Sequence, residues 1–386
     1  MSFITRIPIF KKDLVLFGYE IKGYYEGSFM SCLEGCLNSI GLDVLSKEKI
    51  LFLNVPSEIF EFDNLRDMIP PKRAVFIVNP SQISNKEVFK NLKNQGIMLC
   101  ANISSTLELD NVKEFDYIKI CASNFQGDWT QIPELFKGGK LLVEVGEKDI
   151  FNKAVNSGFD LFEGDFFIQP EIIARKELSP QKAVILSILQ DVRQKDFDFS
   201  KIEEKIKRDP YLTIKLLKFI NSAFFSFKTS INSIRQALVI LGQQEFVRWL
   251  TLVILGKLNE GKPEEIVYRA SERARFMELT ANYVGLYERS QEAFLVGLFS
   301  LAPAMTDISM EEFVKEIPVT EDVRTSLLGR GIFTDLFNLR LAIENAKWLE
   351  MKKIAEGLGI NPNKIEIIIY ESIKWAHDSL LYIDRS

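Results

Sequence analysis

Histidine is nearly missing from this sequence: His377 is the only one among 386 residues. A Ser-His-Asp or Cys-His catalytic site would have to use that residue, and any metal centre built on several histidines is excluded. His377 lies in KWAHDSL near the end of the chain. We expect it to be an ordinary core or surface residue of a helix rather than a catalytic one.

Cysteine, long apolar runs and excess positive charge are also scarce. The four cysteines, Cys32, Cys36, Cys100 and Cys121, predict reduced thiols, because no second pair or histidine cluster completes a zinc site. The longest apolar runs, such as WLTLVIL at 249–255, are far short of the ~20 residues that span a bilayer, and the N-terminus carries charges where a signal peptide needs an apolar core. A net charge of -5 offers no broad cationic surface. We therefore expect a cytoplasmic protein with no cofactor, no metal, no membrane and no nucleic acid as partner.

The first half alternates short apolar runs with helical patterns, and three of the helical segments end in glycine. Strands that are apolar throughout and separated by helices indicate parallel strands covered by helices. Seven or eight strand candidates favour a barrel of the TIM type over a small open sheet. The clearest strand runs are DLVLFGYEIKG, KILFLNVP, RAVFIVNP, GIMLCANI, DYIKICA, KLLVEVG and DLFEGDFFIQP.

After Pro170 the strand patterns stop, and the second half is helical almost to its end. We predict a boundary near 171–180, with an α/β barrel domain over 1–175 and an all-helical domain over 178–386. In the helix expected over 210–223, the spacing places Leu216 and Phe219 toward the core and Lys215 and Lys218 toward solvent.

Two stretches of the second half resemble the HDOD family. RDPYLTIKLLKFINSAFF and INSIRQALVILGQQEFVRWL are similar to its conserved segments. The family is related to the HD metal phosphohydrolases but lacks their metal ligands. Here AFLVGLFSLAPAM places Ser300 and Leu301 at the two ligand positions, and a hydroxyl and an isobutyl group cannot replace an imidazole and a carboxylate. The resemblance implies a domain that is not a metal hydrolase.

The first half resembles the EAL domain of cyclic di-GMP phosphodiesterases, through IPIFKKDLVLFGYEIKG at its start and KLLVEVGEKDIFNKAVNSGFDLFEGDFFIQPEI at its end. The family forms TIM-type barrels and hydrolyses its substrate with two metal ions held by carboxylates. Together the two resemblances imply an EAL-HDOD signalling protein.

The EAL-type positions can be compared one by one. Four keep the family's residue: Glu20, Asn54, Lys119 and Glu144. Six have lost it: Tyr24 stands for an arginine, Ile77 for a glutamate, Asn102 and Ile103 for paired aspartates, Cys121 for an aspartate and Glu163 for a glutamine. The leucine of the motif is Lys22. Isoleucine, amide and thiol leave too little negative charge for two divalent ions, and the loss of the arginine removes a bidentate phosphate contact.

From these losses we expect a non-enzymatic bacterial signalling or regulatory protein. We expect its EAL-type site neither to hydrolyse cyclic di-GMP nor to bind it with useful affinity, and its partner to be a protein. Two alternatives stay open, a weak cyclic di-GMP phosphodiesterase and a nucleotide receptor without catalysis. The sequence leaves open the partner, the signal and the oligomeric state.

Overall fold

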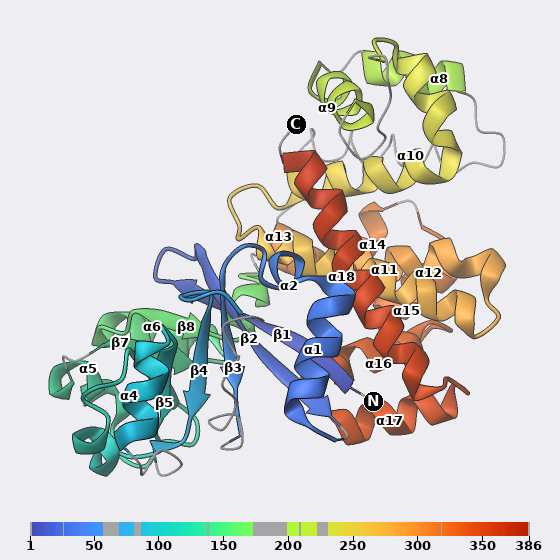
Figure 1. Ribbon diagram of the computed structural model, residues 1–386. Coiled ribbons are helices and arrows are strands. Elements are labelled where there is room, and N and C mark those ends of the chain that lie inside the picture. The colour runs from blue at the N-terminus through green and yellow to red at the C-terminus, as the bar shows by residue number, and fades with distance from the viewer. Residues whose placement is uncertain are drawn as a thin grey trace. The chain divides into compact units, whose positions relative to one another are not determined.

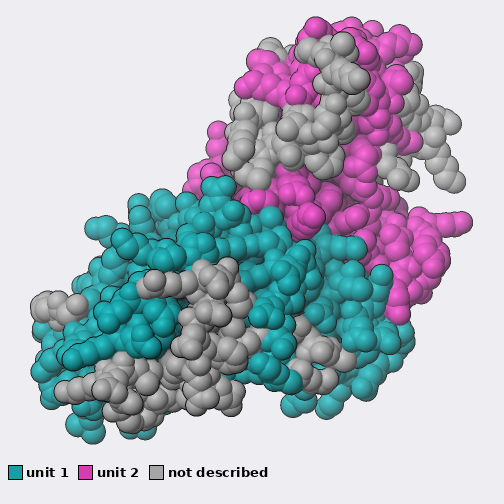
Figure 2. Space-filling view, in the orientation of Figure 1, with its two compact units in different colours: residues 1–169, 338–371 teal, residues 170–337, 372–386 magenta. Residues whose placement is uncertain are grey.

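The structure is a computed structural model, and it forms two compact units, coloured separately in Figure 2. Unit 1 comprises residues 1–169 and 338–371, and unit 2 comprises residues 170–337 and 372–386. The structure describes residues 2–25, 27–56, 69–80, 86–136, 139–172, 199–207, 210–221, 231–317 and 319–384.

Unit 1 contains a closed barrel of eight strands in the order β1 to β8 (Figure 1). Strand β1 pairs antiparallel with both of its neighbours, whereas β2 to β8 are parallel to one another. The carboxyl ends of β2 to β8 therefore open at the same end of the barrel. The strands are β1 Ser2–Lys11, β2 Leu16–Tyr25, β3 Ile50–Asn54, β4 Ala74–Val78, β5 Met98–Asn102, β6 Tyr117–Cys121, β7 Lys140–Glu144 and β8 Leu161–Glu163.

The barrel interior is filled by apolar side chains, which is why these strands read as unbroken hydrophobic runs. Its core cluster contains Ile9, Phe52, Ile77, Cys100 and Leu142, all at most 2% exposed. Helices follow the strands in sequence and are amphipathic. The described helices of this part are α1 Phe29–Ile40, α2 Leu42–Ser46, α4 Lys86–Asn94, α5 Ile132–Leu135 and α6 Lys148–Ser157, with single 3-10 turns at Thr106–Asn111, Trp129–Gln131 and Asp165–Ile168.

The late segment 338–371 groups with the barrel, although the sequence pattern places it in the helical half. Aromatic packing accounts for this, because the ring of Phe3 in β1 stacks on Trp348 with ring centroids 6.3 Å apart. The hydroxyl of Thr5 donates to the backbone carbonyl of Glu344 at 3.5 Å. The helices in or entering this segment are α16 Thr334–Glu344, α17 Trp348–Gly357 and α18 Pro362–Asp384.

Unit 2 is helical in its described part. Its longest helix, α10, begins at Ser233, whose side chain accepts from the backbone N–H of Gln236, and it breaks at Gly242, where φ is 69°. No single helix among the described residues is long and apolar enough to cross a bilayer; the two arms of α10, bent by 106°, meet that criterion only as a pair. The helices are α8 Phe199–Lys207, α9 Pro210–Ile220, α10 Ile234–Leu258, α11 Glu265–Tyr283, α12 Ser290–Phe299, α13 Ala302–Thr306, α14 Met310–Glu316 and α15 Glu321–Leu327, with a 3-10 turn at Tyr287–Arg289.

The expected architecture, a barrel followed by a helical region, is confirmed. Six of the seven apolar runs contain a strand, and the first of them, DLVLFGYEIKG, overlaps most of β2. In α9, Leu216 is fully buried as predicted, while Phe219 is half-buried and stacks on Trp249 with ring centroids 6.1 Å apart. A repeated βα pattern predicts only parallel strands, so it does not predict the antiparallel β1 that closes the barrel.

Candidate functional site at the carboxyl end of the barrel

The strand register brings the EAL-type positions together at the carboxyl end of the barrel. Asn54 is the register partner of Ile77, and Asn102 is that of Lys119. Glu144 ends β7 between two such partners: Cys121 on β6 and Glu163 on β8. Positions that lie up to 143 residues apart in the sequence, from Glu20 to Glu163, thus line one end of one barrel.

A buried ion-pair cluster lies at the centre of this end. The ammonium of Lys119 donates to both carboxylate oxygens of Glu163, at 2.9 and 2.7 Å, and to the carboxylate of Glu20. It also lies 3.8 Å from Oε2 of Glu144. The Lys119, Glu20 and Glu163 side chains are 6%, 3% and 0% exposed. Because buried charges are costly unless they are paired, each of these three groups depends on the others.

Lys22 supplies a second ammonium group to the same carboxylates. Its Nζ lies 3.5 Å from Oε1 of Glu144 and 3.7 Å from Oε1 of Glu163. The Lys22 and Glu144 side chains are 32% and 36% exposed, so solvent reaches this pair but not the groups beneath it. We call Glu20, Lys22, Lys119, Glu144 and Glu163 the mouth cluster. Sequence comparison treats Lys22 and Glu163 only as substituted positions, whereas the structure places both among the contacts.

Burial and mutual attraction shift the pKa values of the cluster in opposite directions. Burial, and then the neighbouring Glu20 carboxylate, raise the pKa of Glu163 well above its usual range. Burial also opposes ionisation of Glu20, but Lys119 and hydrogen bonding outweigh it and lower the pKa of that carboxyl. For Lys119 and Lys22, burial is outweighed by the carboxylates, so both pKa values are raised and both side chains stay cationic. Of the two buried carboxyls, Glu163 is therefore the one on which a proton is favoured.

The substituted positions contribute bulk rather than ligands. Ile77 and Ile103 are 2% and 3% exposed, and Ile77 belongs to the apolar core of the barrel. Asn102 is exposed, and the thiol of Cys121 lies 3.2 Å from the hydroxyl of Ser123. Asn54 is exposed as well.

A lysine lies beside the position where the resemblance implies an arginine. The Nζ of Lys352 in α17 donates to the hydroxyl of Tyr24 at 2.9 Å and lies 4.2 Å from the centroid of its ring. Tyr24 also stacks on Phe3 with ring centroids 6.1 Å apart. No sequence signal indicates this contact, because its two residues are 328 positions apart.

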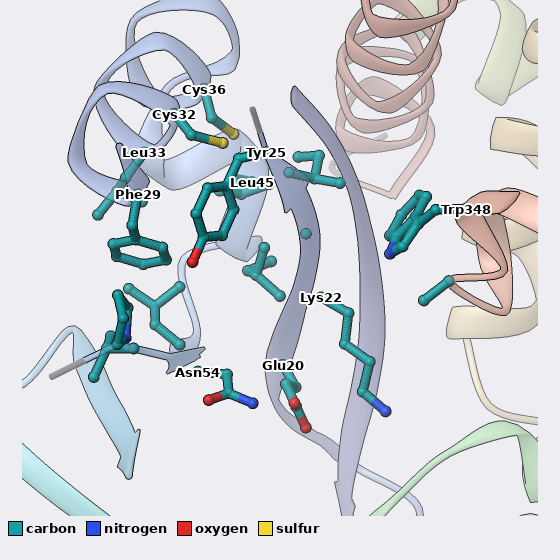
Figure 3. A pocket seen from close by; sticks show the side chains of 17 residues that line it. Glu20, Lys22, Tyr25, Phe29, Cys32, Leu33, Cys36, Leu45, Asn54 and Trp348 are labelled. Atoms are coloured by element: carbon teal, nitrogen blue, oxygen red, sulfur yellow. The ribbon is translucent and has the colours of Figure 1, made fainter. Parts of the chain in front are cut away.

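A cavity of about 470 Å³ adjoins the mouth cluster (Figure 3). This volume falls within the range of small-molecule sites, which are mostly apolar with a few polar groups. In Figure 3, Glu20, Lys22 and Asn54 lie toward one end of the view, and Tyr25, Phe29 and the two α1 cysteines lie toward the other. The thiol of Cys36 is buried, which raises its pKa to about 12 and keeps it protonated.

The described residues do not fit a two-metal centre. Among them, no group of three or more histidine, cysteine, aspartate or glutamate side chains could hold a metal ion. The chemical reason is that Glu20 and Glu163 already accept from Lys119, while Ile77 and Ile103 carry no donor atom.

At the HD-type positions of unit 2, the guanidinium of Arg273 contacts Ser300. Nη1 of Arg273 donates to the hydroxyl of Ser300 at 3.0 Å, and that hydroxyl donates to the backbone carbonyl of Gly297 at 2.6 Å. Leu301 is 5% exposed, and His377, in α18, is 7% exposed. A fixed positive charge beside Ser300 repels a metal cation.

Residues 178–302 match the HDOD domain family. The chain is 31% identical over 239 residues to a Vibrio cholerae protein named cyclic di-GMP phosphodiesterase CdgJ, covering 62% of this chain and 55% of the relative. It thus spans about half the length of that relative. It is 27% identical over an alignment of 412 residues to the uncharacterized protein YuxH of Bacillus subtilis, covering 97% of this chain and 98% of YuxH.

Two solved structures are similar in part. One is the Xanthomonas citri FimX EAL domain in complex with c-diGMP, with a TM-score of 0.34 and 12% identity over 46% of this chain and 91% of that one. The other is an HDOD domain protein with unknown function from Geobacter sulfurreducens, with a TM-score of 0.29 and 18% identity over 53% of this chain and 73% of that one.

The expectation that the chain is not an enzyme is wrong on this comparison, because the relative that is 31% identical carries the name of a phosphodiesterase. The expectation was based on the lost metal ligands alone, whereas the fold also brings other charged groups to this end of the barrel. Lys22 is such a group, at a position where the motif has leucine, and Lys352 is another, outside the motif.

Proposed function

We propose that the chain is a weak cyclic di-GMP phosphodiesterase whose site is the mouth cluster and the adjoining cavity. One observation carries the proposal: two ammonium groups and a solvent-accessible carboxylate, Glu144, converge at the carboxyl end of the barrel beside a cavity of about 470 Å³. The named activity of the Vibrio cholerae relative supports the same reaction and substrate.

The charges of the mouth cluster suit a phosphodiester. Hydrolysis of such a bond requires a group that takes a proton from water and positive charge that stabilises the phosphoryl oxygens. Glu144 is the partly exposed carboxylate and Lys22 the partly exposed ammonium, 3.5 Å apart. The two ammonium groups offset the carboxylates of the cluster, and the raised pKa of Glu163 lowers its negative charge further, which favours an anionic substrate.

The proposal also covers the domain bounds and the roles of the retained motif residues. By sequence we assign residues 1–175 to an EAL-like domain and residues 178–386 to an HDOD domain, with segment 338–371 of the latter belonging to the barrel unit. We take the four retained motif residues to serve the site and not to be evolutionary remnants; they are Glu20, Asn54, Lys119 and Glu144. A cytoplasmic location and a protein partner remain predictions.

The test is hydrolysis of cyclic di-GMP by the purified full chain, followed as release of the linear dinucleotide. We expect slow turnover that falls at least tenfold in Glu144→Gln, because the amide cannot take a proton. Glu134→Gln, at an exposed position of α5, is the matched control and should keep wild-type turnover. Product no higher than in a buffer blank, or equal turnover in Glu144→Gln, contradicts the proposal.

A further inference from the structure

The position of Lys22 gives it a role that its motif does not assign. It follows Glu20 by two residues on β2, so both side chains leave the strand on the same side. In Figure 3, Lys22 extends toward the end of the cavity where Glu20 and Asn54 lie. Its Nζ is within 3.7 Å of two carboxylates, yet the side chain is 32% exposed. It is therefore fixed in place and still able to reach a ligand.

The same ammonium opposes a metal ion at this place. A divalent ion bound to Glu144 and Glu163 would lie next to a cation that already pairs with both carboxylates. From the buried side, Lys119 contacts both oxygens of Glu163 and one oxygen of Glu20, and it lies 3.8 Å from Oε2 of Glu144. Two lysines on different strands, Lys22 on β2 and Lys119 on β6, thus place positive charge where the two-metal chemistry of the resemblance would place its ions.

We infer that this site works without divalent metal ions, and that Lys22 is a catalytic residue that offsets the negative charge of the phosphodiester undergoing hydrolysis. The inference rests on the proposed function and specifies how that site does its chemistry. Lys22 stays protonated throughout, and Lys119 keeps the buried carboxylates neutralised beneath it.

The step balances with water as the only co-reactant. The oxygen of water forms a bond to phosphorus, and the bond from phosphorus to one ribose oxygen breaks. Glu144 takes one proton from the attacking water and then releases it to solvent, while the departing ribose oxygen takes its proton from solvent on the opposite side of phosphorus. No oxidation or reduction occurs, and the Glu144 carboxylate is restored at the end.

The first test measures turnover of cyclic di-GMP by the full chain with and without EDTA. We expect wild-type turnover to be unchanged by EDTA and not increased by Mn²⁺. Lys22→Met should lower kcat at least tenfold, and Lys22→Arg, which restores a positive charge, should recover most of it. Lys12→Met, at an exposed position of the loop after β1, should leave kcat unchanged. Loss of turnover in EDTA that Mn²⁺ restores, or wild-type kcat in Lys22→Met, overturns the inference.

The second test does not need turnover. Electron paramagnetic resonance of Mn²⁺ added at one equivalent to the wild-type chain should show only the spectrum of the free ion. Bound Mn²⁺ that disappears in Glu144→Gln would overturn the inference even in an active enzyme. If the wild-type chain neither hydrolyses cyclic di-GMP nor binds Mn²⁺, the proposed function fails and the catalytic role of Lys22 fails with it, while the exclusion of metal stands.

Discussion

The ammonium of Lys119 lies 2.7 Å from Oε2 of Glu163, on side chains that are 6% and 0% exposed. The two residues belong to β6 and β8, which are separated in the barrel by β7. The contact therefore crosses the barrel interior rather than joining hydrogen-bonded neighbours. The stability of this end of the barrel therefore depends on a buried positive charge, because solvent does not reach the carboxylate that it neutralises.

Removing that charge should destabilise the protein. We expect Lys119→Met to lower the free energy of unfolding by roughly 3 to 5 kcal/mol, because it leaves buried carboxylates short of their partner. Chemical denaturation measures this loss. The control is Lys113→Met, which breaks an ion pair to Asp110 between side chains that are 69% and 87% exposed, and its unfolding midpoint should match that of the wild type. Equal midpoints for both variants would mean that the buried cluster contributes nothing to stability.

The raised pKa of Glu163 predicts how stability depends on pH. Because burial and Glu20 raise this pKa above the usual 4.5, the folded protein keeps a proton that the unfolded chain releases. This contribution to stability is fully present below pH 4.5 and is lost as the pH rises through the folded-state pKa. Relative to Glu163→Gln, whose amide does not titrate, the wild type should lose stability as the pH is raised above 4.5.

Denaturant unfolding of both proteins across this pH range gives the comparison, and Glu134→Gln should follow the wild type. If the curves of the wild type and Glu163→Gln run parallel, Glu163 does not hold the proton.

Gly164 directly follows Glu163 and has a conformation that other residues resist. Its φ is +126°, and a Cβ atom there would lie 2.2 Å from the backbone oxygen of Val145. We expect Gly164→Ala to cost roughly 2 kcal/mol or more, from backbone strain and the clash together. Gly146→Ala, whose Cβ would meet nothing within 4 Å, should stay within about 0.5 kcal/mol. Thermal or chemical unfolding of the pair tests this, and similar losses would contradict it.

Helix α9 of unit 2 carries one buried and one exposed side chain only two residues apart. Leu216 is fully buried and Lys218 is exposed. Leu216→Ala should cost roughly 2 to 5 kcal/mol as a cavity-forming change, and Lys218→Ala should stay within about 0.5 kcal/mol. The unfolding transition of the full chain reports both. A larger effect at Lys218 would mean that the opposite face of α9 packs inward.

The sequence by itself determined the strands of the barrel. Parallel strands buried on both faces must be apolar throughout, and each such run stands out between amphipathic helices, as in AVFIV of β4. Helix ends were equally local: Gly158 ends α6 with φ at 96°, a conformation that glycine adopts at little cost. The motif positions Glu20, Lys119 and Glu144 could also be placed on strands, because each lies within an apolar strand run of the sequence.

Only the tertiary structure decided which charges meet. Lys22 and Glu144 are 122 residues apart, and Tyr24 and Lys352 are 328 apart. Their contacts depend on how the barrel closes through the antiparallel β1 and on where α17 packs, and neither leaves a periodic signal in the sequence. A count of lost ligands therefore describes the motif correctly and still misjudges the site, since electrostatics depends on distance in space and not along the chain.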